Sequence, residues 1–295
     1  MRYTAQHTKQ TATVSAEQGN EPVVHKTGGR ISQFIQHSKE LVRFYKDGLK
    51  QIWSNYQLTK EIRGKLEKDG MDSLTRQEFQ LLRRSQKDMI KLIPFGFIFM
   101  ILPESIPLFV IFVPGMIPST CLKENQIRKQ REKLDEKRQQ ITKYTLMSSK
   151  KIEAIKPEDF LSKDKFRKLA IHYGHEFDLQ YIMRKNLSAY CRFMGLSDFG
   201  PAPMLRKRLA KHMNYLDQDD RFLIKENSVD TLSPKELCQA VEERGMRSID
   251  DDEENMRRGL KYWLSLSQPT NPKQTKIPPG LLVFSRVFLL NATYK

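Results

Sequence analysis

Cysteine is scarce in this sequence, and the few cysteines lie far apart. Cys121, Cys191 and Cys238 are the only three, and no Cys-x-x-Cys pair occurs. This spacing supports neither a zinc module nor the disulfide framework of a small secreted protein. We therefore expect reduced, structural thiols, which suit the cytosol or the mitochondrial matrix better than an extracellular setting.

Motifs for catalysis and metal binding are lacking as well. There is no glycine-rich phosphate loop, nucleophile elbow or pair of catalytic carboxylates. His172 and His175 are separated across a glycine, unlike the two histidines that bind zinc from one helix. The acidic runs 217–220 and 250–254 lack the glycine and glutamate positions of an EF-hand loop. We expect no enzyme activity, no cofactor and no metal.

Acidic residues are too few to balance the basic ones, and the formal net charge is +16. Residues 1–151 carry +12 of this charge and residues 152–295 carry +4. An excess of this size predicts an anionic partner, such as lipid headgroups, RNA or an acidic protein.

The N-terminus lacks the apolar core of a secretory signal. Residues 1–16 contain Arg2 and Lys9, several hydroxyl residues and no acid, a composition typical of a mitochondrial transit peptide. Because no arginine-rich amphipathic helix accompanies this composition, a plain disordered tail fits equally well. We predict that residues 1–30 are a disordered or transit segment.

Apolar residues recur at helical spacing within residues 31–91, with lysines and arginines on the other faces. The pattern predicts amphipathic helices, which either lie on an anionic membrane surface or pack on the rest of the protein. Thr75 and Glu78 form a capping-box sequence, and Leu74 is placed as a hydrophobic staple. A helix from about Arg76 is expected to continue directly into the apolar stretch that follows.

Long apolar runs are absent apart from this one stretch. The 31 residues between Lys91 and Lys123 contain a single charged side chain, Glu104. As one helix they would be about 46 Å long, well beyond a hydrocarbon core of about 30 Å. Buried core helices rarely stay apolar for so long, so residues 92–120 are predicted to be a single-pass transmembrane segment.

Prolines interrupt this predicted transmembrane segment. An internal proline removes a helix hydrogen bond and clashes with the preceding turn, and lipid cannot satisfy the freed carbonyls. We expect a break between Pro103 and Pro107, in either one tilted span or two short arms. Glu104 lies at this break, where it either faces an ion path or a partner, or merely sits where the helix bends. The five prolines are Pro94, Pro103, Pro107, Pro114 and Pro118.

Residues 121–155 predict a charged connecting helix. Apolar residues repeat every seven positions from Ile127 to Ile141, but the positions between them hold mostly polar side chains. Because this seam is too narrow and too short for a coiled coil, we expect a solvated helix.

Residues 156–295 predict an all-helical domain. Leu205, Leu209 and Leu216 share one helix face and are expected in the core. Ser233 and Glu236 form a second capping-box sequence. Start and stop signals predict helices at 162–174, 176–195, 204–216, 233–245 and 250–266. The last apolar segment, 277–290, is expected to be a short helix or a strand, of which the helix is favoured.

A basic set lies within residues 180–211, which hold seven basic residues against one acid, Asp198. Tyr181, Tyr190 and Phe193 are interleaved with it, a combination suited to RNA phosphates. Residues 212–256 then hold 13 acids against five bases, a dipolar arrangement that fits docking on a large composite surface such as a ribosome. Two solvated helix faces are the alternative. The basic set is Arg184, Lys185, Arg192, Arg206, Lys207, Arg208 and Lys211.

The order of several motifs resembles the LETM (leucine-zipper/EF-hand-containing transmembrane) family of mitochondrial inner-membrane proteins. The motifs are "LTRQEFQLLRR…D…KLIPF", "LPESIPLFVIFVPGMIPST" and "LSPKELCQAVEERGMR…LKYWLSLS…IPPGLLVFSRVF". The resemblance covers roughly residues 40–295. It implies a single-pass inner-membrane protein with a helical, ribosome-binding-like domain in the matrix. Because neither an EF-hand nor a coiled coil follows "SRVFLL", the chain resembles the short LETM-domain type, and calcium sensing is not expected.

The family is linked to mitoribosome association, respiratory-chain biogenesis, cation/proton exchange and mitochondrial morphology. We therefore expect an inner-membrane anchor that binds mitochondrial ribosomes, through rRNA or ribosomal proteins, or assembly factors. It would support respiratory-chain biogenesis and mitochondrial structure. Anionic inner-membrane lipids and a homo-oligomer or other inner-membrane proteins are further expected partners.

Two alternative functions are open. One is a subunit of a cation/proton exchanger or channel, with Glu104 on the ion path. The other is a soluble two-helix nucleic-acid module within residues 232–264, which is hard to reconcile with the apolar stretch 92–120.

Overall fold

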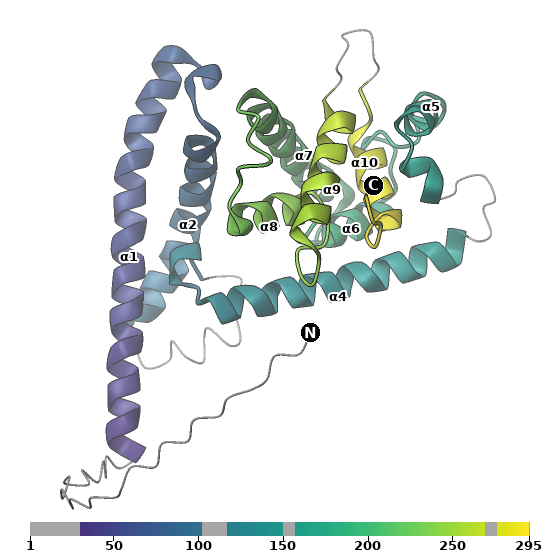
Figure 1. Cartoon of the computed structure of the whole chain (residues 1–295). Helices are drawn as coiled ribbons and strands as arrows, with labels where there is room; N and C mark the ends of the chain where they lie inside the picture. The colour runs from purple at the N-terminus through teal and green to yellow at the C-terminus, as the bar shows by residue number, and fades with distance from the viewer. Residues whose placement is uncertain (1–29, 102–116, 150–156, 269–275, 295) are drawn as a thin grey trace, which may run out of the picture. The chain divides into compact units, whose positions relative to one another are not determined.

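The structure, a computed structural model, describes residues 30–101, 117–149, 157–268 and 276–294. Every regular element in these ranges is helical (Figure 1), which confirms the mainly α prediction for the described part of the chain. The predicted disordered or transit segment lies outside these residues except for Arg30, which begins the first helix.

Helix α1 (Arg30–Asp69) has 40 residues and crosses the boundary between two compact units, residues 1–45 and 46–295. In the second unit, Ile52, Thr59 and Ile62 are buried and recur at helical spacing. Over residues 46–69 the helix therefore packs on the protein, which is one of the two alternatives that its sequence left open.

Helix α2 (Arg76–Ile101) follows a short 3-10 turn, η1 (Met71–Ser73). Its start is the predicted capping box, because the Thr75 N–H donates to Glu78 Oε2 at 2.7 Å and the Glu78 N–H donates to Thr75 Oγ1 at 3.2 Å. Leu74 is buried in a cluster with Ile62, and Phe79 packs on the same cluster. The predicted cap and staple are both confirmed.

The far end of α2 enters the apolar stretch without a loop, as predicted, and reaches Ile101. No helix among the described residues is both long enough and apolar enough to cross a membrane. Pro103, Glu104 and Pro107 lie outside the described residues, so the transmembrane segment and the break within it stay predictions.

The chain is described again from Ile117, where it lies against α2. The Ser119 N–H donates to Asp88 Oδ1 at 2.7 Å, and Lys91 Nζ donates to the Ile117 carbonyl at 3.2 Å. Ser119 begins a short 3-10 helix, η4 (Ser119–Cys121). The Thr120 hydroxyl donates to the Gly48 carbonyl of α1 at 3.0 Å. A Cβ at Gly48 would come within 2.7 Å of the Cys121 sulfur, so only glycine permits this approach.

Helix α4 (Glu124–Ser149) is part of the domain that follows, and the prediction of a solvated connecting helix is wrong for its inner face. Arg138 is buried, and its guanidinium donates to the carbonyls of Phe193, Met246 and Glu242 at 2.7–2.9 Å. The Thr142 hydroxyl, also buried, donates to a carbonyl of the last helix. Arg138 and Thr142 can be buried because backbone carbonyls far along the chain accept their hydrogen bonds. The spacing of apolar residues in the sequence does not reveal such distant acceptors.

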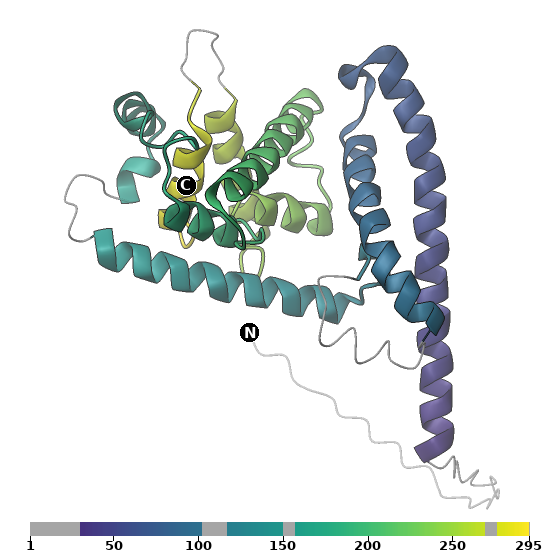
Figure 2. The same ribbon diagram turned by 180° about the vertical axis from the view of Figure 1, so that it is seen from behind.

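The rest of the chain is a helical bundle with one large apolar core. Figures 1 and 2 show α7, α8 and α9 side by side, with α4 running along α6 and α10. Leu205, Leu209 and Leu216 are buried in this core, as predicted. The elements are η5 (Pro157–Phe160), α5 (Lys163–Tyr173), α6 (Arg184–Phe193), α7 (Ala202–Lys225), α8 (Pro234–Glu243), α9 (Glu253–Ser267) and α10 (Pro279–Phe288).

Most predicted helix ends in the domain are close to those observed, with two exceptions, of which the first is the helix predicted at 204–216, because α7 continues to Lys225. The predicted helix 176–195 begins only at Arg184, because turns occupy residues 174–183. Asp178 Oδ1 accepts the N–H of Gln180 at 2.9 Å, a local bond that competes with helix formation. The capping box of Ser233 and Glu236 is present as predicted, with both reciprocal bonds formed.

Candidate functional site

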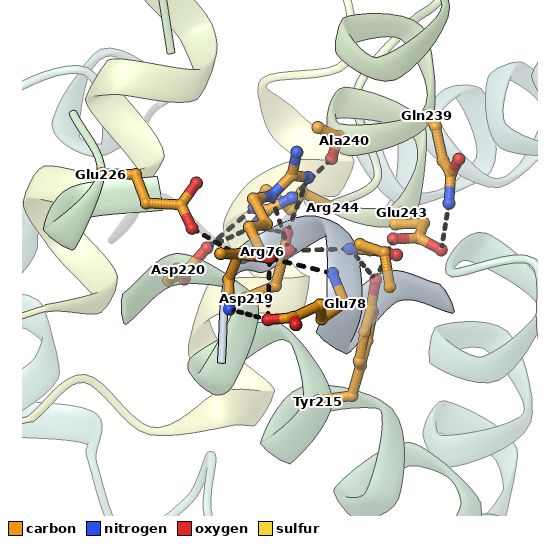
Figure 3. Close-up of polar contacts among 12 residues, drawn as sticks. Arg76, Glu78, Tyr215, Asp219, Asp220, Glu226, Gln239, Ala240, Glu243 and Arg244 are labelled. Atoms are coloured by element: carbon orange, nitrogen blue, oxygen red, sulfur yellow. Dashed lines mark hydrogen bonds and ion pairs between the residues drawn. The ribbon is translucent and has the colours of Figure 1, made fainter. Parts of the chain in front are cut away.

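Two adjacent aspartates on α7 lie at the centre of a buried ionic network (Figure 3). The Arg244 guanidinium lies 2.7 Å from the Asp219 carboxylate and 2.5 Å from the Asp220 carboxylate. Arg76, from the first turn of α2, lies 2.8 Å from the Asp219 carboxylate. The Trp263 indole N–H of α9 donates to Asp220 at 2.8 Å. The network thus joins α2 to three helices of the domain.

The charges in this network are mutually dependent. Burial alone would raise the pKa of Asp219, but the positive charges of Arg244 and Arg76 outweigh burial and hold it below its ordinary value. Burial also works against the charged form of Arg244, but Asp220 and Asp219 outweigh it and raise the pKa of the guanidinium. The Asp219 carboxylate and the Arg244 guanidinium are therefore ionised at neutral pH.

A second group of polar side chains extends the network along α2 and α7. The Gln80 amide donates to the Tyr215 hydroxyl and to Asp219, both at 2.7 Å. The Tyr215 hydroxyl donates to Glu243 Oε2 at 2.6 Å. His212 Nε2 lies 2.9 Å from the Glu243 carbonyl, and burial lowers the pKa of this imidazole to about 4. The imidazole is therefore neutral at physiological pH.

This network has the properties of a structural clamp. Its acceptors face donors of the same protein, and both aspartates are essentially unexposed, so they offer no contact to a substrate. Removing one partner of such a buried pair typically costs about 3–5 kcal/mol, because it leaves an uncompensated charge. Its role is to fix α2, and with it the apolar stretch, to the helical domain.

Sequence analysis missed this network, although one signal was present. The acids of the run 217–220 do not fit a calcium loop and otherwise enter the sequence-based prediction only through the charge of residues 212–256. Asp219 and Asp220 fall between Leu216 and Leu223 on the core face of α7, and all four are buried. Acids at core positions of an amphipathic helix predict buried partners of opposite charge, even though they do not identify them.

The basic set is divided by the structure into two kinds of residue. Arg206 donates to the carbonyls of Leu179 and Gln180, and Arg208 donates to those of Ser197 and Phe199. These two arginines therefore hold the loops before α6 and before α7. Arg192 pairs with Asp198 at 2.6 Å.

The other members of the basic set face solvent. Lys185, Lys207 and Lys211 are exposed, and none of them has a hydrogen bond or ion pair with another described residue. Arg184 is also exposed, and its Nε donates to the Gly200 carbonyl at 3.2 Å. This bond brings the beginning of α6 beside the residues that precede α7.

Exposed apolar side chains lie around the same place. Phe199 is 83% exposed, and Met183 and Met204 are exposed as well. Met204, Lys207 and Lys211 follow at helical spacing and so share one face of α7. We call these residues together the α6–α7 surface. It consists of Met183, Arg184, Lys185, Phe199, Met204, Lys207 and Lys211.

The helix ends strengthen the positive potential of the α6–α7 surface. Neither α6 nor α7 has an acid in its first turn, and neither has a side chain that caps its N-terminus. The partial positive charge of each helix N-terminus is therefore uncompensated by the protein. Basic side chains at such helix ends suit an anionic partner.

The predicted aromatic residues are only partly at this surface. Tyr181 is exposed, but Tyr190 and Phe193 are buried in the core, so their predicted role beside RNA is wrong. Residues 187, 190, 191 and 193 are the buried positions of α6, and helical periodicity alone identifies that face as the core face. Phe199, Met183 and Met204 were missed because isolated apolar residues carry no signal of exposure.

Metal ligands do not gather among the described residues, where no three His, Cys, Asp or Glu side chains could hold an ion together. The His175 ring stacks on Tyr181 instead, with the ring centroids 4.2 Å apart. The membrane-segment candidates Pro103, Glu104 and Pro107 are not among the described residues.

Comparisons with known proteins agree on one family. A family model described as "LETM1-like, RBD" matches residues 74–289, which include the ionic network and the α6–α7 surface. The "Mitochondrial proton/calcium exchanger protein" of Drosophila melanogaster is 33% identical over 242 residues, covering 74% of this chain and 23% of that protein. The "LETM1 domain-containing protein mdm28, mitochondrial" of Schizosaccharomyces pombe is 27% identical over 241 residues, covering 73% of this chain and 49% of that protein. The chain thus spans about a quarter and about half of the length of these relatives.

Proposed function

The chain belongs to the LETM1-like family, and we propose that it is a mitochondrial inner-membrane protein whose helical domain binds the mitochondrial ribosome in the matrix. Both relatives carry "mitochondrial" in their names, which supports the compartment. The letters RBD in the family description denote a ribosome-binding domain, which supports the partner. Through this contact the protein would support respiratory-chain biogenesis and mitochondrial structure.

The observation that carries the proposal is the α6–α7 surface. A ribosome presents phosphate-rich RNA together with protein, and this surface offers cations beside exposed apolar side chains. Lys185, Lys207 and Lys211 have no acidic partner among the described residues, so a phosphate can approach them without displacing an ion pair. The uncapped ends of α6 and α7 add to the attraction.

Co-sedimentation with mitochondrial ribosomes tests the partner. The full-length protein, solubilised in mild detergent, is expected to pellet with purified ribosomes at low salt. Pelleting should fall steeply as salt rises, because counterion release contributes to every phosphate contact. Protein that stays in the supernatant at every salt concentration would show that it does not bind the ribosome.

A second candidate function is cation/proton exchange, which the name of the Drosophila melanogaster relative favours. Glu104 is the acid that such an activity would use, because it is the one charged residue of the apolar stretch. Proton-coupled cation flux into liposomes that contain the full chain should then be lost in Glu104→Gln. Equal flux in the two proteins would exclude this use of Glu104.

A further inference from the structure

Helix α2 has an exposed apolar stripe along the part that enters the apolar stretch. Ile90, Ile93, Phe97 and Met100 are 67–86% exposed and follow at intervals of three and four residues, so they share one face. Fully burying a side chain of this size contributes about 1.5–3 kcal/mol, so four such side chains in water forgo a large stabilisation. An exposed stripe of this kind marks an interaction surface.

Hydrogen bonds between α2 and the residues around η4 limit how the apolar stretch can be placed in a membrane. Asp88 and Lys91 precede the apolar stretch, and Ile117 and Ser119 lie near its end. They are joined by two hydrogen bonds, of 2.7 Å and 3.2 Å. Ile117 is fully buried at this junction. The bond between Thr120 and the Gly48 carbonyl of α1 fixes the same point from another side. Lys91 and Ile117, on either side of residues 92–116, therefore lie together.

The distances exclude a single crossing with these contacts intact. Residues 92–116 as one helix would be about 37 Å long, and a hydrocarbon core is about 30 Å thick. A single crossing would thus hold Lys91 and Ile117 tens of ångströms apart, whereas a hydrogen bond joins them. The alternative with two short arms agrees with the contacts.

We propose that Lys91 and Ile117 lie at the same face of a phospholipid bilayer, with the apolar stripe of α2 among the acyl chains of one leaflet. This proposal rests on the membrane attachment in the proposed function and replaces the predicted single pass. Residues 46–91 and 117–295 then lie on one side of the membrane.

The lengths suit one leaflet. From Lys91 to Ile101, α2 advances about 15 Å, which is half of a hydrocarbon core of about 30 Å. Lys87 and Lys91 on α2 lie at the base of the stripe, where anionic headgroups attract cations.

The native cysteines allow a simple test with a membrane-impermeant maleimide attached to polyethylene glycol. Cys121 and Cys191 are fully buried, and burial raises the pKa of both thiols, in Cys121 to about 11. Both react poorly as a result, because the thiolate is the nucleophile. Glu67 and Lys163 are exposed, lie on either side of the apolar stretch, and have no side-chain partner among the described residues, so each can be replaced by cysteine without loss of a contact.

The test uses the full chain with Glu67→Cys and Lys163→Cys together, in sealed phosphatidylcholine vesicles that contain cardiolipin. Only protein that floats with the vesicles is scored, and the wild-type chain measures labelling of the native cysteines. A same-face topology gives molecules with two labels or none, whichever way they insert. Detergent should then convert all of them to two labels.

Molecules that carry one label before detergent and two after it would overturn the proposal and restore the single crossing. If none of the protein floats, the membrane attachment itself fails, and this proposal fails with it. Flotation therefore separates a failure of the attachment from a failure of the topology.

Discussion

The guanidinium of Arg244 lies 2.7 Å from the carboxylate of Asp219, and neither side chain is exposed to solvent. Because Asp219 also pairs with Arg76, one carboxylate connects the helix that enters the apolar stretch with the core of the domain. These buried charges fix the helical domain to its proposed membrane attachment. Removing any one of them should lower the free energy of unfolding.

Replacing Arg244 with methionine should be strongly destabilising. The change leaves Asp219 and Asp220 buried with one ionic partner fewer, and we expect a loss of about 3–5 kcal/mol in the free energy of unfolding. Urea unfolding of the full chain in detergent measures this loss. Arg192→Met is the matched control, because its pair with Asp198 is exposed and should contribute less than about 1 kcal/mol. Similar losses in the two variants would contradict the role given to the network.

His212 should make the stability of the domain depend on pH. Burial lowers its pKa from the ordinary value of 6.5 to about 4, so the unfolded chain binds the proton more tightly. Stability is therefore complete above pH 6.5 and is lost as the pH falls towards 4, by at most about 3 kcal/mol.

Unfolding of the wild type and of His212→Gln between pH 4 and pH 7 isolates this effect. Glutamine keeps a donor for the Glu243 carbonyl but does not titrate. The variant should lose part of the pH dependence, while the part that comes from Asp219 and other carboxylates remains. Identical pH profiles would show that His212 is not the titrating group.

Phe97→Glu should weaken the attachment to lipid. The residue lies on the exposed stripe of α2, and a carboxylate among acyl chains is costly. We expect a marked fall in the fraction that floats with cardiolipin-containing vesicles. The control is Ile171→Glu, because Ile171 is an equally exposed apolar residue on α5. An equal effect of the two changes, or no effect of Phe97→Glu, would show that the stripe does not insert into the membrane.

Features encoded by neighbouring residues could be predicted from the sequence. The capping boxes at Thr75 and Ser233, the start of α2 and the core face of α7 all depend on residues within a few turns of one another. Features made by residues far apart could not be predicted. Arg138 is buried because three distant carbonyls accept its N–H groups, and the Arg76–Asp219 pair joins residues that are 143 positions apart.

The candidate surface shows the same division. The basic set was identified from its charge excess, but only the structure shows that Arg206 and Arg208 bind loop carbonyls. Reversing their charge would disturb those loops as well as any interface. Lys185, Lys207 and Lys211 are free of this complication, because they have no partner among the described residues.

Binding of the mitochondrial ribosome by the α6–α7 surface is tested most directly by reversing these three lysines to glutamate in one full-length protein. Its co-sedimentation with ribosomes is compared with that of a control in which the exposed Lys163, Lys168 and Lys235 are reversed, which changes the net charge equally. We predict that the first variant stays in the supernatant while the control pellets like the wild type. Pelleting of both variants at the wild-type level would contradict the account.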